Sequence, residues 1–142
     1  MIMIKKFTFE NEALREKAFS IRHKVFVVGQ NCPADLEYEF EEESTHFLLF
    51  EDEIPLATAR HRKTEKGFKL ERFAVLEAAR GKGYGMQILQ AILHDLKDEK
   101  EEKYMHAQEQ VLPFYEKLGF KKEGDLFEEA GIMHYKMKFV RD

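Results

Sequence analysis

The sequence predicts an α/β protein with a mixed, mostly antiparallel sheet flanked by helices. Short segments alternate between apolar and polar residues, as strands do, and two longer segments repeat apolar residues at helical spacing. In chain order they give a strand, a helix, three strands, a helix, a strand, a short helix and two strands. The helix between the fourth and fifth strands implies one parallel, right-handed crossover.

The first half of the chain opens with a loosely alternating strand at residues 2–9. A helix of about four turns follows, with Asn11 as its candidate N-cap. Its apolar stripe consists of Leu14, Ala18, Ile21 and Val25. The acidic run at residues 34–44 is interpreted as a solvated loop or helix. The three strands expected next cover residues 45–51, 55–63 and 67–76. Short polar connections between them indicate an antiparallel meander.

The second half contains a longer apolar helix that begins in the glycine-rich segment 81–85. Its buried stripe consists of Ile88, Leu89, Ile92, Leu93 and Leu96. The charged run at residues 98–103 is expected to be the solvated end of this helix. The remaining elements are a strand at 103–108, a helix from Pro113 to Leu118, and strands at 120–123 and 132–140.

Length and composition predict one domain, residues 1–142, with 44% hydrophobic and 35% charged residues. The net charge of −4 argues against a nucleic-acid partner. No apolar stretch approaches the ~20 residues of a membrane span, so we expect no membrane partner. Cys32 is the only cysteine and the N-terminal residues lack a leader pattern, which predicts a cytoplasmic protein without disulfides. The histidines show no zinc-ligand spacing, so no metal is expected.

A glycine-rich loop carries the clearest chemical signal. The segment Arg80–Gly85 (RGKGYG) joins a strand to a helix, and its glycines permit a tight turn and a close approach to a ligand. The first amides of the helix, with its dipole, then suit a pyrophosphate. The spacing fits neither a Walker loop nor a Rossmann fingerprint, because Gly83 and Gly85 stand one residue too close for the latter. A glycine-rich turn without a ligand is the alternative.

Two motifs together resemble the signature of the GNAT acyltransferase superfamily. Leu70–Gly85 matches its apolar strand, short linker and Arg-Gly-x-Gly-x-Gly/Ala loop. Pro113–Phe120 is similar to the second signature, Phe-Tyr-x-x-x-Gly-Phe, at the usual distance from the first. The order of elements also matches over nearly the whole chain. The resemblance therefore implies the GNAT acyl-CoA N-acyltransferase fold.

Further residues are similar to the ElaA/YjcF-like group of bacterial GNAT proteins. These are Ile21, Arg22, Val25–Val27, Gln30, Pro33, Glu37, His46, Ala107, Gln108 and Glu129–His134. Gly29 departs from this group, which commonly carries Glu at that position. The resemblance to the group does not identify the acceptor.

The family resemblance implies acetyl-CoA as the co-substrate. Its pyrophosphate is expected on the backbone amides of residues 81–86, and its pantetheine arm along the strand 73–75, where an amide would polarise the thioester carbonyl. Gln108 would bond the pantetheine amide and Lys117 a phosphate, unless they are an ordinary strand end and a solvated lysine. The cofactor-binding candidates are Phe73, Ala74, Val75, Arg80, Gly81, Lys82, Gly83, Tyr84, Gly85, Met86, Gln108, Phe114 and Lys117.

Two residues are the catalytic candidates. Glu71 stands where polyamine-acetylating relatives carry a proposed water-linked base, and burial among apolar neighbours would raise its pKa. Alternatively, Glu71 pairs with Arg72, Arg60 or Arg62. Tyr115 matches the family tyrosine that protonates the leaving thiolate, and the alternative is a purely packing aromatic. Cys32 would be a nucleophile only with a base nearby, so an inert cysteine is the simpler interpretation.

The acceptor pocket is expected to contain basic, aromatic and histidine side chains. The candidates are Arg22, Phe26, His46, Arg60, Arg72 and His134. The glutamates of segment 37–43 favour a cationic amine, whereas arginines that converge on the sheet favour an acceptor with an anionic group. We favour the second of these. Both histidines stay open between a pocket role and a structural one.

The sequence thus predicts an acetyl-CoA-dependent N-acetyltransferase. It would acetylate a primary amine of a small-molecule or peptide acceptor by direct attack in a ternary complex. The alternative is a non-catalytic acyl-CoA-binding sensor or regulatory module, and the presence of both Glu71 and Tyr115 favours the enzyme. Whether the protein forms a homodimer is left open.

Overall fold

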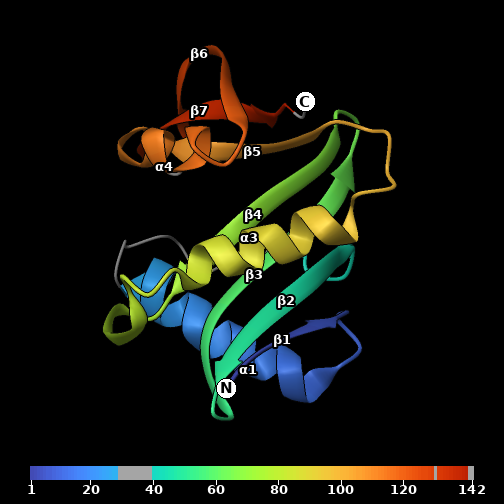
Figure 1. Ribbon diagram of the computed structural model, residues 1–142, viewed down its shortest axis with the longest axis vertical. Helices are drawn as coiled ribbons and strands as arrows, with labels where there is room; N and C mark the ends of the chain where they lie inside the picture. Colours follow the sequence, from blue (N-terminus) through green and yellow to red (C-terminus); the bar gives the residue numbers. More distant parts are fainter. Residues whose placement is uncertain (29–39, 130, 141–142) are drawn as a thin grey trace. The chain divides into compact units, whose positions relative to one another are not determined.

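The computed structural model describes residues 1–28, 40–129 and 131–140 (Figure 1). The chain forms two compact units. The first consists of Met1–Arg62 and Arg72–Glu99, and the second of Lys63–Glu71 and Lys100–Asp142. No helix within the described ranges is long and apolar enough to span a lipid bilayer.

Seven strands form one mixed sheet in the order β1-β2-β3-β4-β5-β7-β6. They are β1 Ile2–Phe7, β2 Ser44–Glu51, β3 Ile54–Thr64, β4 Gly67–Val75, β5 Lys103–Gln108, β6 Phe120–Glu129 and β7 Ile132–Phe139. Strands β4 and β5 run parallel, with Phe68 opposite Lys103 and Lys69 opposite Tyr104. The β1–β2, β2–β3, β5–β7 and β6–β7 pairs are antiparallel. The predicted α/β class, with its mixed and mostly antiparallel sheet, is confirmed.

The helices flank this sheet. They are α1 Glu12–Arg22, continued by a π-helical segment His23–Val28, then α3 Tyr84–Asp95 and α4 Leu112–Glu116. Short 3₁₀ turns cover Glu77–Ala79 and Glu109–Val111. Asn11 caps α1 as predicted, because its Oδ1 accepts a hydrogen bond from the Leu14 amide at 3.1 Å.

In the first unit, helices cover both faces of β2. Leu48 belongs to a buried cluster with Ala18 and Ile21 of α1, and α3 also packs against β2. Successive side chains of a strand point to opposite faces, so the neighbouring Leu49 lies on the other face. Both leucines are completely buried. This explains why residues 47–50 form a continuous apolar run rather than an alternating one.

In the second unit, β4 and β5 begin side by side. The Phe68 amide donates to the Glu102 carbonyl at 2.7 Å. Gly67 allows this approach, because a Cβ there would lie only 2.2 Å from the same carbonyl oxygen. Phe120 and Met137 supply buried apolar side chains from β6 and β7.

Two predicted boundaries are wrong. Helix α3 ends at Asp95, and the charged run 98–103 is a turn followed by the start of β5, because Leu96 is buried and the Glu99 amide turns back to its carbonyl. Strand β6 extends to Glu129 instead of ending at Glu123. A register irregularity between Glu123 and Phe127, together with exposed charged side chains, hides its pattern in the sequence.

Candidate active site

The glycine loop forms the start of α3 in the first unit. Gly81 and Gly83 have φ angles of +85° and +79°, and Gly83 occupies the N-cap position. Such angles favour glycine on conformational grounds alone. A Cβ at either residue would meet nothing within 4 Å, so the backbone there faces open space. The first intrahelical bond runs from the Gln87 amide to the Gly83 carbonyl, and the preceding amides have no carbonyl partner within the helix.

Charged groups surround this loop. Arg80 is exposed, and its Nε donates to the Val75 carbonyl at 3.1 Å, which ties the loop to the end of β4. Lys82 Nζ lies 4.0 Å from Glu51 Oε1 and is also exposed. Tyr84 is buried, and this burial, followed by a hydrogen bond to Glu51, raises the pKa of its phenol. The phenol of Tyr84 therefore keeps its proton at neutral pH.

The end of β4 contacts the start of α3. Within this strand Arg72 has a φ of +58°, an angle rare for residues other than glycine. A left-handed residue inside a strand breaks its regular alternation and redirects the residues that follow, here Phe73–Val75. Ala74 is buried, and a Cβ on Gly85 would lie 3.9 Å from the Val75 side chain. The sequence gives no signal for this irregularity.

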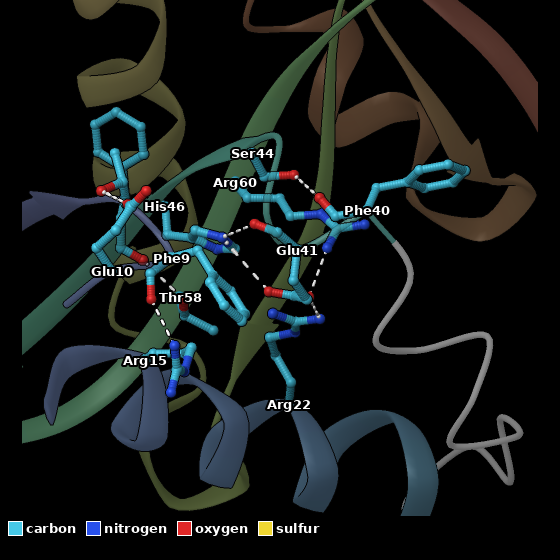
Figure 2. Close-up of polar contacts among 12 residues, drawn as sticks. Phe9, Glu10, Arg15, Arg22, Phe40, Glu41, Ser44, His46, Thr58 and Arg60 are labelled. Atoms are coloured by element: carbon cyan, nitrogen blue, oxygen red, sulfur yellow. Dashed lines mark hydrogen bonds and ion pairs between the residues drawn. The ribbon is translucent and has the colours of Figure 1, made fainter. Parts of the chain in front are cut away.

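Arg22, Glu41, His46 and Arg60 form a buried cluster in the first unit (Figure 2). Both guanidinium groups donate to Glu41 Oε1, that of Arg60 at 2.6 Å. His46 Nε2 lies 3.2 Å from the Glu41 carbonyl, and its ring stacks on Phe7 at 5.2 Å. Burial lowers the pKa of His46, so the ring is neutral and its Nε2–H donates to that carbonyl.

This cluster corrects the prediction for the acidic run and changes the interpretation of Arg22 and Arg60. The acidic run is not wholly solvated, because Glu41 is buried and binds two arginines. Arg22 and Arg60 do converge, but on this carboxylate, and each is only 1% exposed. Their convergence is therefore no longer a reason to expect an anionic acceptor.

In the second unit, one face of the sheet carries the catalytic candidate from β4. Glu71 forms an ion pair with Lys69, with 3.2 Å between Oε1 and Nζ. Both side chains are 12% exposed. The parallel register pairs Lys69 with Tyr104, and residues two apart in a strand share a face. Glu71 therefore lies on the same face as Tyr104 and His106 of β5.

Strands β5 and β7 each place a histidine on this face, and β6 adds Glu129. His106 Nδ1 lies 3.0 Å from Glu129 Oε2. His134 is buried, its Nδ1 lies 2.7 Å from the Ile132 carbonyl, and its ring stacks on Phe127 at 6.0 Å. His134 pairs across the sheet with Gln108, which is half-buried at the end of β5.

Helix α4 carries the second catalytic candidate. Tyr115 packs edge-on against Phe114 and Phe120, at ring-centroid distances of 5.1 and 6.1 Å. Burial raises the pKa of its phenol to about 12, so the proton stays on the oxygen at neutral pH. Phe114 is exposed on this helix, and Lys117 is exposed at its C-cap.

Comparison with known proteins identifies the family. A model of the acetyltransferase (GNAT) domain matches residues 8–141. The chain belongs to the GNAT acetyltransferase family. It is 37% identical over 131 residues to the uncharacterized N-acetyltransferase YjcF of Bacillus subtilis (strain 168), covering 90% of this chain and 94% of that protein. The predicted resemblance to the ElaA/YjcF-like group of GNAT proteins is confirmed.

Solved structures support the same GNAT fold. Escherichia coli ElaA matches with a TM-score of 0.87 and 25% identity, covering 97% of this chain and 99% of that one. The PaiA N-acetyltransferase of Thermoplasma acidophilum, solved in complex with coenzyme A, matches with a TM-score of 0.69 and 18% identity over 99% of each chain. This second likeness is one of fold.

Some of the predicted site residues of this GNAT chain belong to the first unit and the others to the second. The first unit holds Arg22, Phe26, His46, Arg60, Arg72, Phe73–Val75 and Arg80–Met86, and the second holds Glu71, Gln108, Phe114, Tyr115, Lys117 and His134. Phe26 lies in the π-helical segment, and Cys32 lies outside the described residues. Sequence reasoning missed His106 and named Glu129 only in the subgroup resemblance, without a role. The two residues are far apart in the chain and meet only through strand pairing.

Proposed function

We propose that this GNAT protein transfers an acetyl group from acetyl-CoA to a primary amine of a small-molecule or peptide acceptor. The observation that carries the proposal is the loop at the start of α3. Two glycines with positive φ place open space in front of helix amides that lack partners within the helix. Such a helix N-terminus suits a pyrophosphate, and Arg80 adds positive charge. The coenzyme A complex of the PaiA fold neighbour supports the same class of ligand.

The residues around the loop have distinct tasks in this proposal. The amides of residues 81–86 bind the pyrophosphate, and an amide of Phe73–Val75 donates to the thioester carbonyl, where negative charge develops during attack. The left-handed Arg72 supports this role, because it redirects the strand just before those three residues. Acetyl-CoA supplies the acyl group when it is bound.

Glu71 and Tyr115 handle protons in this proposal. Glu71 attracts the cationic acceptor and takes one proton from it, directly or through water. Tyr115 donates to the departing thiolate. A buried phenol with a pKa of about 12 gives up its proton reluctantly, but burial also raises the proton affinity of a thiolate. The ternary complex is proposed to react by direct attack, without a covalent enzyme intermediate.

The first test is calorimetric titration of the purified protein with acetyl-CoA, coenzyme A and NAD. Saturable binding of both coenzyme A species, with no binding of NAD, is expected. Absence of coenzyme A binding would refute the proposal and the acyl-CoA sensor alternative together. Release of free thiol with a panel of amines then separates the enzyme from the sensor, because only the enzyme turns over.

A matched pair of variants tests the loop. Gly83→Ala and Gly83→Asp share the strain of a positive φ, which costs about 1–2 kcal/mol, and neither side chain meets a crowded neighbour at its Cβ. Only Gly83→Asp adds a negative charge where the pyrophosphate is expected. We expect Gly83→Asp to bind coenzyme A at least roughly 10-fold more weakly than Gly83→Ala, about 1.4 kcal/mol. Equal affinities would refute the assignment of the loop.

A further inference from the structure

The polar face of the second unit contains a His–Glu pair with defined geometry. His106 Nδ1 lies 3.0 Å from Glu129 Oε2. The hydrogen bond with His106 is the main cause that lowers the pKa of Glu129 to about 2, with smaller contributions from Lys69 and His134. Glu129 is therefore an ionised carboxylate and can only accept. The proton of this bond must lie on His106 Nδ1.

This tautomer leaves Nε2 of a neutral His106 as a lone-pair acceptor. The ring is held on two sides by aromatics, with centroid distances of 5.9 Å to Tyr104 and 4.9 Å to Phe127. Within the part of the chain that the structure describes, Nε2 has no hydrogen-bond partner. The side chain is 22% exposed, so solvent reaches the ring. A fixed imidazole with an available nitrogen is the arrangement of a proton acceptor.

Strand register places His106 on the same face as Glu71. Lys69 pairs with Tyr104, and Glu71 and His106 lie two residues further along their parallel strands. The positive charge of Lys69 lowers the pKa of Glu129, and Lys69 also forms an ion pair with Glu71. Lys69 therefore links the Lys69–Glu71 pair to the His106–Glu129 pair. Two groups suited to accept protons therefore occur on neighbouring strands of one unit.

Amide formation requires two proton removals from the acceptor nitrogen. An alkylammonium must lose one proton to become a nucleophile, and it must lose a second once the N–C bond has formed and the C–S bond breaks. One proton equivalent ends on the thiolate through Tyr115, whose own proton is restored by the one that Glu71 takes, and the other is released to solvent. The proposed function names Glu71 as one acceptor and leaves the second proton without a protein group.

We propose that His106, oriented by Glu129, is this second proton acceptor for the substrate amine. Nε2 takes the proton from the substrate nitrogen and passes it to solvent, while the Nδ1–H bond to Glu129 stabilises the imidazolium that forms. Glu129 is a positioning residue in this scheme. The inference rests on the proposed transfer to an amine and adds a residue to it.

The test compares His106→Asn with the wild type. The Asn amide can still donate to Glu129 but cannot accept the substrate proton. We expect kcat to fall roughly 100-fold or more, with an unchanged dissociation constant for coenzyme A. Added imidazole should restore part of the rate. His94→Asn, an exposed residue on α3, is the matched control and should keep the wild-type kcat.

A pH profile separates catalysis from structure. If His106 accepts the substrate proton, the dependence of kcat on pH should differ between His106→Asn and the wild type. The other titratable groups on or beside this face are Lys69, Glu71, Glu102, Tyr104, Glu123, Glu129, His134, Lys136 and Lys138. His94→Asn removes an exposed imidazole on α3 and should keep the wild-type pH profile. Glu129→Gln should lower kcat and shift the tautomer of His106, which nitrogen NMR of the histidine rings reads independently of activity.

The outcomes are distinguishable. A wild-type protein that binds no coenzyme A refutes the proposed function and this inference together. Normal turnover in the wild type with an unchanged kcat and pH profile in His106→Asn refutes this inference alone. An NMR spectrum showing the proton on Nε2 of neutral His106 also refutes it.

Discussion

Burial changes the role of individual residues in this chain, and Glu41 is the clearest case. It belongs to an acidic run, but its side chain is 6% exposed and accepts from both Arg22 and Arg60. A carboxylate shared by two buried guanidinium groups holds α1 to β3 through charge. If one of these three residues is replaced, the charges that remain are buried without a compensating partner.

Substitution of Glu41 should therefore destabilise the protein strongly. We expect Glu41→Gln to lower the free energy of unfolding by about 3–5 kcal/mol, because the amide lacks the charge that offsets the arginines. Denaturant titration measures the effect. Glu42→Gln, an exposed neighbour, is the control and should stay within about 0.5 kcal/mol. A small change in Glu41→Gln would mean that other groups neutralise the arginines.

Tyr115 is proposed to act in the reaction, as the group that protonates the thiolate. Tyr115→Phe should lower kcat roughly 100-fold or more, because the thiolate loses its proton donor, while coenzyme A affinity changes little. Tyr135→Phe is the control, since it removes a phenol from β7, outside the proposed chemistry. Steady-state assays by thiol release measure both. An unchanged rate in Tyr115→Phe would show that water or another group protonates the sulfur.

At the scale of elements, close backbone contacts fix how strands join. The parallel pairing of β4 with β5 begins at Phe68, whose amide bonds the Glu102 carbonyl. Gly67 precedes it with a φ of +134° and touches the same carbonyl. The strand that carries Lys69 and Glu71 is therefore positioned by a contact that tolerates no side chain.

A pair of glycine variants tests this contact. Gly67→Ala would force a Cβ to 2.2 Å from a backbone oxygen, in addition to conformational strain. Gly124 in β6 also has a positive φ, +81° against +134° at Gly67, but open space around its Cβ, so Gly124→Ala should cost only the strain, about 1–2 kcal/mol. We expect Gly67→Ala to be clearly less stable in denaturant titrations. Equal losses would indicate that β5 shifts to make room.

At the scale of the whole molecule, we expect two buried histidines to contribute to the response to acid. Burial is the main cause that lowers the pKa values of His46 and His61 in the folded state. As the pH falls below the ordinary histidine pKa of 6.5, the unfolded chain therefore binds more protons than the folded chain. The stability is fully present above that value and is lost as the pH falls through it.

Unfolding free energies at two pH values test this expectation. We expect the protein to lose about 1 kcal/mol or more between roughly pH 7.5 and pH 5.5. His61→Gln should reduce the loss, whereas His23→Gln, an exposed histidine, should not. Glu129, whose pKa is lowered to about 2, contributes to stability in a separate pH range. This stabilisation is lost only as the pH falls below the ordinary pKa of glutamate. A flat response above pH 5.5 would contradict the histidine assignment.

The sequence by itself determined the element order, the single parallel crossover, the cap at Asn11 and the family. These depend on local patterns: apolar periodicity, glycines at a strand-to-helix junction, and two motifs at a fixed distance. The sheet type followed because strand order and connection length restrict the topology. The catalytic and binding roles inferred from the same motifs stay predictions.

Only the tertiary structure decided which polar residues meet. Glu41 looked like part of a solvated run, and Arg22 and Arg60 looked available to an acceptor, until folding brought the three together. His106 and Glu129 are separated along the chain, so no local pattern announces their pairing. The left-handed Arg72 is equally invisible, because its angle opposes the local preference of arginine. Long-range strand register and burial set these contacts, and neither is encoded in any one segment.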